Sequence, residues 1–163
     1  MNQQSSTIQD ETATSLVDPA ERGALSHPMV FVNLPVADVA ASRDFFTRVG
    51  YTFDERMCNE QGAGLVLGPN IYAMLLERSF FAQFHHATTS GPGEVEVLTC
   101  LAAASREEVD RVVDAAIAAG GRDVRREDGA PFMYGRTFAD PDGHHWEIMW
   151  MDVEAATEAG AFG

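Results

Sequence analysis

The chain has 163 residues, a length that fits one domain or two small ones and allows a hydrophobic core without disulfide or metal support. Hydrophobic residues make up 45% and charged residues 22%, which is typical of a globular protein and excludes collagen, coiled-coil and wholly disordered chains. The formal net charge of -14 would repel a phosphate backbone, and no apolar run reaches the ~20 residues of a membrane span. We therefore expect neither nucleic acid nor a membrane as a partner.

The N-terminal part of the chain, residues 1–27, is rich in Gln, Ser and Thr and has no sustained apolar period, which predicts a flexible tail. No basic segment followed by an apolar one is found there, so we predict no signal peptide and expect a cytoplasmic protein. The two cysteines, Cys58 and Cys100, form no CxxC pair and are expected to be reduced and mostly buried.

A first set of elements starts after the tail. Residues 29–36 alternate in the manner of a strand, Asp38 is placed to cap a helix, and Gly50 is placed to end it. Further strand-like segments follow at 51–56, 64–67 and 71–76, with a Gly-Pro-Asn turn between the last two.

A second set repeats this order. Residues 94–101 are a strand candidate, and Ser105 begins a capping box, Ser-Arg-Glu-Glu, for a helix that ends at Gly120. Short strand candidates follow at 122–125, 133–138 and 144–151, and an Asp-Pro-Asp-Gly turn precedes the last.

The two sets have the same landmarks at nearly constant separation. The helix caps lie 67 residues apart, the helix-ending glycines 70, and the prolines of the last turns 72. The repeat predicts an α+β fold of two βαβββ modules, 28–79 and 94–152, with residues 153–163 as a C-terminal tail.

The segment between the modules contains Phe80, Phe81 and Phe84 at helical spacing. It is either a helix packed on the sheet or a lid over a pocket or subunit contact. His85 and His86 follow without an HxxxH spacing, and we expect both at the surface.

Three stretches resemble the vicinal oxygen chelate superfamily, which includes glyoxalase I, bleomycin-resistance proteins, fosfomycin-resistance enzymes and extradiol dioxygenases. They are FVNLPVADVAASRDFFTRVGY, SREEVDRVVDAAIAAGG and YGRTFADPDGHHWEIMWMD. The likeness covers residues 29–152 and is closest to the glyoxalase-like branch called predicted lactoylglutathione lyase. It implies the glyoxalase/bleomycin-resistance fold, in which the two modules form a cup-shaped mixed sheet around a small-molecule ligand, and it implies a homodimer.

Metal-dependent members of this superfamily place His, Glu or Gln on the first and last strand of each module. Carried onto this chain, these positions are Phe31, Met74, Val97 and Glu147. Phe, Met and Val offer no oxygen or nitrogen lone pair to a hard or borderline metal, so we favour no cofactor. A divalent metal held by Glu147 with Asn33 and His145 as shifted donors is the alternative.

The last predicted strand carries the polar residues of the candidate site. Its alternation places His145 and Glu147 on the cavity side and the tryptophans on the helix side. Counting outward from the turn places Arg136 opposite Glu147, with Tyr134 on the same face. Glu147 is then either a ligand-binding or catalytic carboxylate or a structural remnant paired with Arg136. His145 is either an acid/base group or an exposed residue.

Three functions remain open. The first is a glyoxalase/bleomycin-resistance-like protein that binds a small molecule in the cup without metal. The second is a metal-dependent lyase, isomerase or dioxygenase-type enzyme with Glu147 and His145 as catalytic candidates. The third is an assembly protein with a vestigial cup. The residues expected to touch a ligand are Phe31, Asn33, Met74, Val97, Tyr134 and Arg136.

Overall fold

The structure is a computed structural model that describes residues 27–91, 93–127 and 129–162. The predicted N-terminal tail lies outside these residues except for His27. The first module consists of β1 (Val30–Val36), α1 (Val39–Val49), β2 (Thr52–Asp54), the 3-10 turn η2 (Glu55–Met57), β3 (Gly62–Gly68) and β4 (Ile71–Glu77).

A short connection of α2 (Arg78–Phe81) and the 3-10 turn η3 (Ala82–Phe84) follows the first module. The second module consists of β5 (Leu98–Ala102), α3 (Arg106–Ala118), β6 (Arg122–Glu127), β7 (Met133–Ala139) and β8 (His145–Met151). A last helix, α4 (Val153–Glu158), lies in the segment predicted as a C-terminal tail and begins where Asp152 accepts a hydrogen bond from the Ala155 amide.

Both modules form a four-stranded mixed sheet with the same strand order. The orders are β1-β4-β3-β2 and β5-β8-β7-β6. In each sheet the first strand pairs in parallel with the last, and the remaining pairs are antiparallel. The predicted α+β fold of two βαβββ modules is thereby confirmed.

The helix boundaries follow the predicted signals. The Asp38 carboxylate accepts from the Ala41 amide at 3.0 Å, and the Ser105 hydroxyl accepts from the Glu108 amide at 3.2 Å. After each helix comes a glycine in the left-handed region, Gly50 with φ 114° and Gly120 with φ 108°, where a side chain would be strained.

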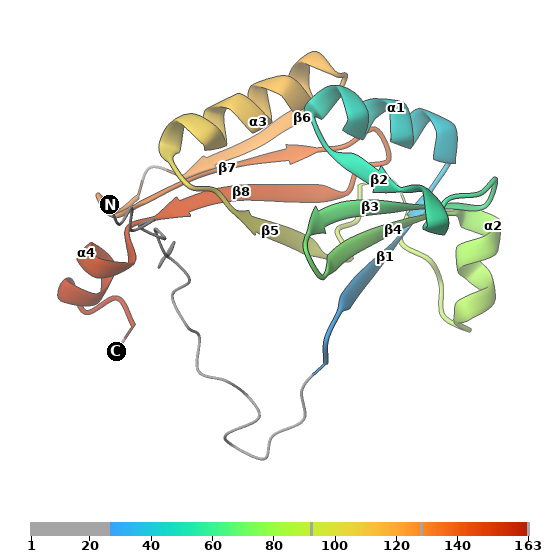
Figure 1. The fold of residues 1–163 in the computed structure, drawn as a ribbon, viewed down its shortest axis with the longest axis horizontal. Helices are drawn as coiled ribbons and strands as arrows, with labels where there is room; N and C mark the ends of the chain where they lie inside the picture. The colour runs from blue at the N-terminus through green and yellow to red at the C-terminus, as the bar shows by residue number, and fades with distance from the viewer. Residues whose placement is uncertain (1–26, 92, 128, 163) are drawn as a thin grey trace, which may run out of the picture.

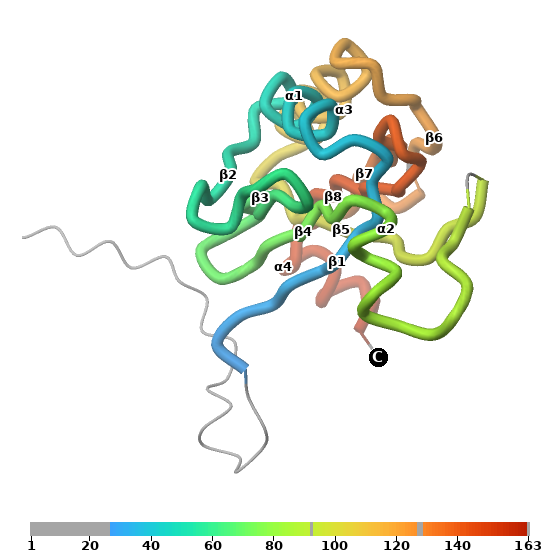
Figure 2. The backbone as a smooth tube through the Cα atoms, turned by 90° about the vertical axis from the view of Figure 1, so that its right-hand side faces the viewer, coloured from blue at the N-terminus to red at the C-terminus, as the bar shows by residue number. Residues whose placement is uncertain are grey.

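The two long helices lie together on one face of the two sheets. In Figure 1, α1 and α3 run across the top of the molecule and the strands of both sheets lie beneath them. Figure 2, turned by 90°, shows the same two helices side by side above the sheet layer. Among the described residues, the opposite face of the sheets has no comparable helical layer, and α2 and α4 lie toward its two ends (Figure 1).

The core fills the space between the helices and the sheets and is continuous across the modules. The Phe46 ring lies 5.1 Å from the Trp146 ring, and Phe45 lies 6.2 Å from Phe138, measured between centroids. Trp146 and Phe45 are each 1% exposed. Apolar contacts between aromatic residues of α1, β7 and β8 therefore hold the two modules together.

The turn between β7 and β8 also links the modules, through polar contacts. Asp142 accepts from the Ala37 amide at 2.7 Å and from the Ser42 hydroxyl at 3.2 Å, both at the start of α1. The buried Asp140 accepts from the Trp146 indole at 3.0 Å, and its burial raises the pKa of its carboxyl. We name residues 140–144 the docking turn.

Candidate functional site

Strand alternation divides each sheet into a face covered by α1 and α3 and an open face. Trp146 and Ile148 are buried under the helices, so His145 and Glu147 project to the open face, as predicted. In the first module, buried Leu34 faces the helices, and the open face therefore carries Asn33 and its neighbours in register.

The open face of the first module is largely apolar. Asn33 pairs with Met74, and Phe31 pairs with Tyr72, whose ring stacks on that of Phe31 at 5.3 Å between centroids. Phe31 is 45% exposed. Tyr72 is buried, so the exposed Phe31 ring, supported by Tyr72 from below, is the surface that could hold an apolar part of a ligand.

The open face of the second module carries Glu147 between Cys100 on β5 and Thr137 on β7. Partial desolvation of the thiol and the neighbouring Glu147 carboxylate, which accepts a hydrogen bond from the thiol, raise the pKa of Cys100 to about 11. The thiol is therefore protonated near neutral pH and is a poor nucleophile. Cys58 and Cys100 are both free, as predicted, but Cys100 is exposed rather than buried.

The predicted pairing of Arg136 with Glu147 is wrong. Thr137 lies opposite Glu147, and Arg136 lies opposite Ile148 on the face that α3 covers. There its guanidinium contacts Asp110 at 3.0 Å and Asp114 at 2.8 Å. Burial disfavours the charge, but these carboxylates still raise the pKa of Arg136 above its usual value.

Tyr134 also lies on the helix-covered face, so its expected place on the ligand side is likewise wrong. Its ring is buried, and its hydroxyl donates to Asp110 at 2.6 Å. This hydrogen bond, ahead of the contact with Arg136, lowers the pKa of Asp110. Tyr134 and Arg136 thus anchor α3 to β7 and do not face a ligand on the open side.

The expected position Val97 needs a correction of one residue. Asn33 and Met74 are paired across the first sheet in the same way as Cys100 and Glu147 are paired across the second. Phe31 lies two residues before Asn33, so its counterpart lies two residues before Cys100, which is Leu98. Val97 precedes β5 and packs against the core. The predicted strand over 94–101 therefore starts four residues too early.

The side chains at the four family positions do not fit a metal ion. Phe31, Met74 and Leu98 have no oxygen or nitrogen donor, and Glu147 alone supplies one carboxylate. Within the described parts of the chain, no group of three His, Cys, Asp or Glu side chains is placed to hold a metal. We therefore derive no reaction step through a metal at this position.

A cavity of about 340 Å³ lies where α2 and the following segment meet the end of β1. Pro35, on the open-face side of β1, forms part of its wall, and α2 packs against both β1 and β4. The linker helix is thus packed on the sheet, but only Arg78–Phe81 is α-helical. The remaining lining residues are Phe81, His85, Thr88, Thr89, Ser90 and Glu96.

The hydrogen bonding of His85 indicates what kind of group this cavity could hold. Its Nε2 lies 3.2 Å from the Thr89 hydroxyl, but its Nδ1 is buried and has no hydrogen-bond partner among the described residues. A buried polar atom left in this state costs about 1–3 kcal/mol. Both linker histidines were expected at the surface; His86 is exposed, whereas His85 is half-buried with its Nδ1 atom covered.

His144, which is buried, supports the same end of the site. His144 Nε2 donates to the Pro35 carbonyl at 2.8 Å, and Nδ1 contacts the Glu96 carboxylate. These contacts position Glu96 at the cavity wall. His85, Glu96 and His144 were not predicted as site residues, because they are brought together only by contacts between segments far apart in the sequence.

Comparison with known proteins agrees with this architecture. Residues 29–68 match the family model described as bleomycin resistance protein-like N-terminal. A hypothetical protein from S. aureus is 26% identical, with a TM-score of 0.67 over 82% of this chain and 99% of the other. A comparison with curated proteins finds no match.

Two further solved structures share the fold at lower identity. A glyoxalase/bleomycin resistance protein/dioxygenase family enzyme from Burkholderia phytofirmans is 22% identical, with a TM-score of 0.61 over 75% of this chain and 97% of the other. A lactoylglutathione lyase from Agrobacterium tumefaciens is 16% identical, with a TM-score of 0.60 over 78% and 95%.

No helix in the described residues is long and apolar enough to span a membrane. The sheet order, the module repeat and the match over residues 29–68 all point to one architecture. The chain thus has the glyoxalase/bleomycin-resistance fold, and its resemblance to the vicinal oxygen chelate superfamily is confirmed.

Proposed function

We propose that the protein binds a small organic molecule on the open face of its two sheets, with the cavity beside α2 holding a polar group of the ligand. The observation that carries this proposal is the buried Nδ1 of His85, which lines the cavity and has no hydrogen-bond partner among the described residues. A ligand that hydrogen-bonds to this nitrogen would remove the cost of leaving it unpaired.

The chemistry of the cavity favours a ligand with N–H or O–H donors. Glu96 supplies a carboxylate, and Thr88 and Thr89 supply hydroxyl groups. The net charge of -14 favours approach of a neutral or cationic molecule over an anion. The exposed ring of Phe31, which stacks on the buried Tyr72 on the same face of the sheet, offers a surface for the apolar part.

The test compares two neighbouring histidines. Native mass spectrometry of the purified protein should show a co-purified small molecule, and a panel of small amines and alcohols should include compounds that raise the melting temperature. The His85→Ala variant should lose both effects, whereas His86→Ala, at an exposed position, should keep them. Equal behaviour of the two variants, or no bound compound in the wild type, would contradict the proposal.

A metal titration separates this function from a lyase-type activity. We expect calorimetry to show no micromolar binding of zinc, nickel or manganese to the chelator-treated protein. Binding that disappears in Glu147→Gln would favour the metal-dependent enzyme instead. A stable homodimer that binds neither metal nor small molecule would favour an assembly role.

A further inference from the structure

The two modules differ most at the turn before their last strand. Five residues, 140–144, connect β7 to β8, whereas only residues 69 and 70 connect β3 to β4. The longer docking turn reaches across to the first module and places Asp142 against the Ala37 amide and the Ser42 hydroxyl. It thereby pairs polar groups at the start of α1 with a side chain of the second module.

At the start of α3, the equivalent backbone amide has a different hydrogen-bond partner. Ala104 is the counterpart of Ala37, and its amide donates to the Glu108 carboxylate of α3 itself at 2.8 Å. Glu108, a residue of α3 itself, thus accepts the hydrogen bond from the amide before α3, whereas Asp142 of the second module accepts the bond from the amide before α1 in the first. Beyond Glu108, a cavity of about 230 Å³ remains between the end of β3 and the end of β5.

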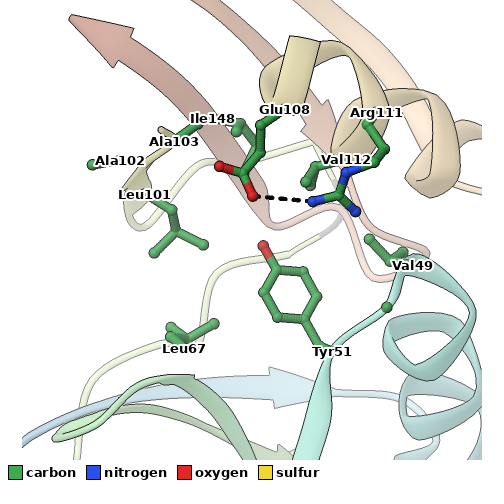
Figure 3. A pocket seen from close by; sticks show the side chains of 11 residues that line it. Val49, Tyr51, Leu67, Leu101, Ala102, Ala103, Glu108, Arg111, Val112 and Ile148 are labelled. Carbon is green, nitrogen blue, oxygen red and sulfur yellow. Dashed lines mark hydrogen bonds and ion pairs between the residues drawn. The ribbon is translucent and has the colours of Figure 1, made fainter. Parts of the chain in front are cut away.

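The residue that follows the glycine at the end of each long helix is a tyrosine in the first module and a glycine in the second. Tyr51 and Gly121 each follow the glycine that ends a helix, and each amide donates to a helix carbonyl. A Cβ on Gly121 would lie 2.9 Å from the Ala116 carbonyl oxygen and 3.0 Å from that of Ala139, so no side chain fits there. The Tyr51 side chain, by contrast, projects into the cavity (Figure 3).

The cavity is partly open: its walls include apolar side chains, and its polar side is formed by Glu108 and Arg111, whose side chains are 37% and 66% exposed. Figure 3 shows the Tyr51 hydroxyl directed toward Glu108 and Arg111, which are joined by an ion pair of 3.0 Å. Burial, followed by the Glu108 charge and opposed by Arg111, raises the pKa of Tyr51 to about 12. The hydroxyl is therefore a hydrogen-bond donor at neutral pH. The apolar walls are formed by Val49, Leu67, Leu101, Val112 and Ile148.

We propose that this cavity is a second small-molecule site, separate from the open face, for a neutral monocyclic compound with one hydroxyl group, such as a phenol. Apolar cavities of roughly 150 Å³ take up benzene, so about 230 Å³ has room for a ring and its hydroxyl. The ring lies against Leu67 and Leu101, and the hydroxyl donates to Glu108 while it accepts from Tyr51.

The charges on the polar side of the cavity exclude the ionised alternatives. Glu108 and Arg111 compensate one another, so an anion gains little from Arg111 and is repelled by Glu108. A cationic group would compete with Arg111 for the same carboxylate. A neutral hydroxyl, which both donates and accepts, satisfies Glu108 and Tyr51 together.

The test uses phenol as the probe and toluene as its apolar match, both titrated into the isotope-labelled full chain by NMR. Phenol should cause saturable shifts centred on the cavity residues and should bind more tightly than toluene. Tyr51→Phe should weaken phenol binding about fivefold to tenfold and leave toluene binding unchanged, because only one hydrogen bond is removed. Tyr72→Phe, on the open face, is the matched control and should bind both probes like the wild type.

Three results would overturn the proposal. They are the absence of saturable shifts with phenol, shifts centred on the open face, and equal loss of phenol binding in the Tyr51 and Tyr72 variants. The His85→Ala variant keeps this test separate from the proposed function, since it should lose the open-face ligand and still bind phenol.

Discussion

The buried indole of Trp146 gives a sharp measure of how the modules are held together. Trp146→Phe removes the donor of the 3.0 Å hydrogen bond to Asp140 and leaves that carboxylate oxygen unpaired. This loss costs about 1–3 kcal/mol. The smaller ring also leaves space beside Phe46 and Phe138, which adds about 1–2 kcal/mol. We expect the free energy of unfolding to fall by roughly 2–5 kcal/mol in total.

Trp150→Phe is the matched control, because Trp150 lies on the same face of β8. Its half-buried ring carries the Arg106 guanidinium at 4.8 Å from the centroid, a contact that phenylalanine largely keeps. We expect a loss below about 1 kcal/mol. Urea unfolding followed by far-UV circular dichroism measures both variants without relying on tryptophan fluorescence. Equal losses in the two variants would refute the reasoning.

Three other predictions address packing, pH and assembly. Gly121→Ala should lower the free energy of unfolding by about 1–3 kcal/mol, because its Cβ would meet two backbone carbonyls, whereas Gly135→Ala, with its nearest neighbour at 3.5 Å, should cost less in the same urea titration. The raised pKa of Asp140 means that the folded chain holds this proton more tightly than the unfolded chain does, so stability should fall as the pH rises from 3.8 toward the raised value. Asp140→Asn should remove this part of the pH dependence. Urea titrations of both proteins over a series of pH values measure it, and an equal change of the free energy of unfolding with pH in the two proteins would contradict the prediction. Light scattering at micromolar concentration should give twice the 17.7 kDa of one chain, because β1 and β5 are sheet edges, and a mass of 17.7 kDa would argue against a dimer.

The sequence predicts those parts of the fold that depend on local signals. The caps Asp38 and Ser105 and the glycines after the helices each act within one turn, so they can be recognised without knowing the tertiary structure. Alternation likewise placed Glu147 on the open face, because the apolar Trp-x-Ile-x-Trp pattern of β8 indicates which side faces the helices.

Register between strands depends on turn geometry, and here the prediction was off by one residue. The docking turn leaves Ala139 paired with His145, which places Thr137 opposite Glu147. The prediction assumed a turn of residues 140–143, which places Arg136 opposite Glu147. The turn has one residue more, and a shift of one residue moves a side chain to the other face of the sheet. The position carried over from the family resemblance, Val97, also lies one residue before the counterpart of Phe31 in the observed register, Leu98.

The cavity beside α2 could not be predicted, because its lining comes from β1 and from the segment between the modules, which lie far apart in the sequence. His85 lies after η3, and Glu96 lies just before β5. Each is placed by long-range contacts, such as the contact of Glu96 with His144. Local sequence patterns carry no information about such contacts.

The docking turn also has a consequence for the order of folding. Its hydrogen bonds to Ala37, Ser42 and Pro35 join residues 105, 100 and 109 positions apart, whereas the strands of each module pair within that module. Closing so long a loop costs more entropy than closing the turns inside one sheet, so these bonds should form after the transition state for folding. Removal of Asp142 should therefore accelerate unfolding and leave the refolding rate almost unchanged. The turn would then slow unfolding without affecting the folding rate, and so lengthen the time for which the two modules stay joined once the chain has folded.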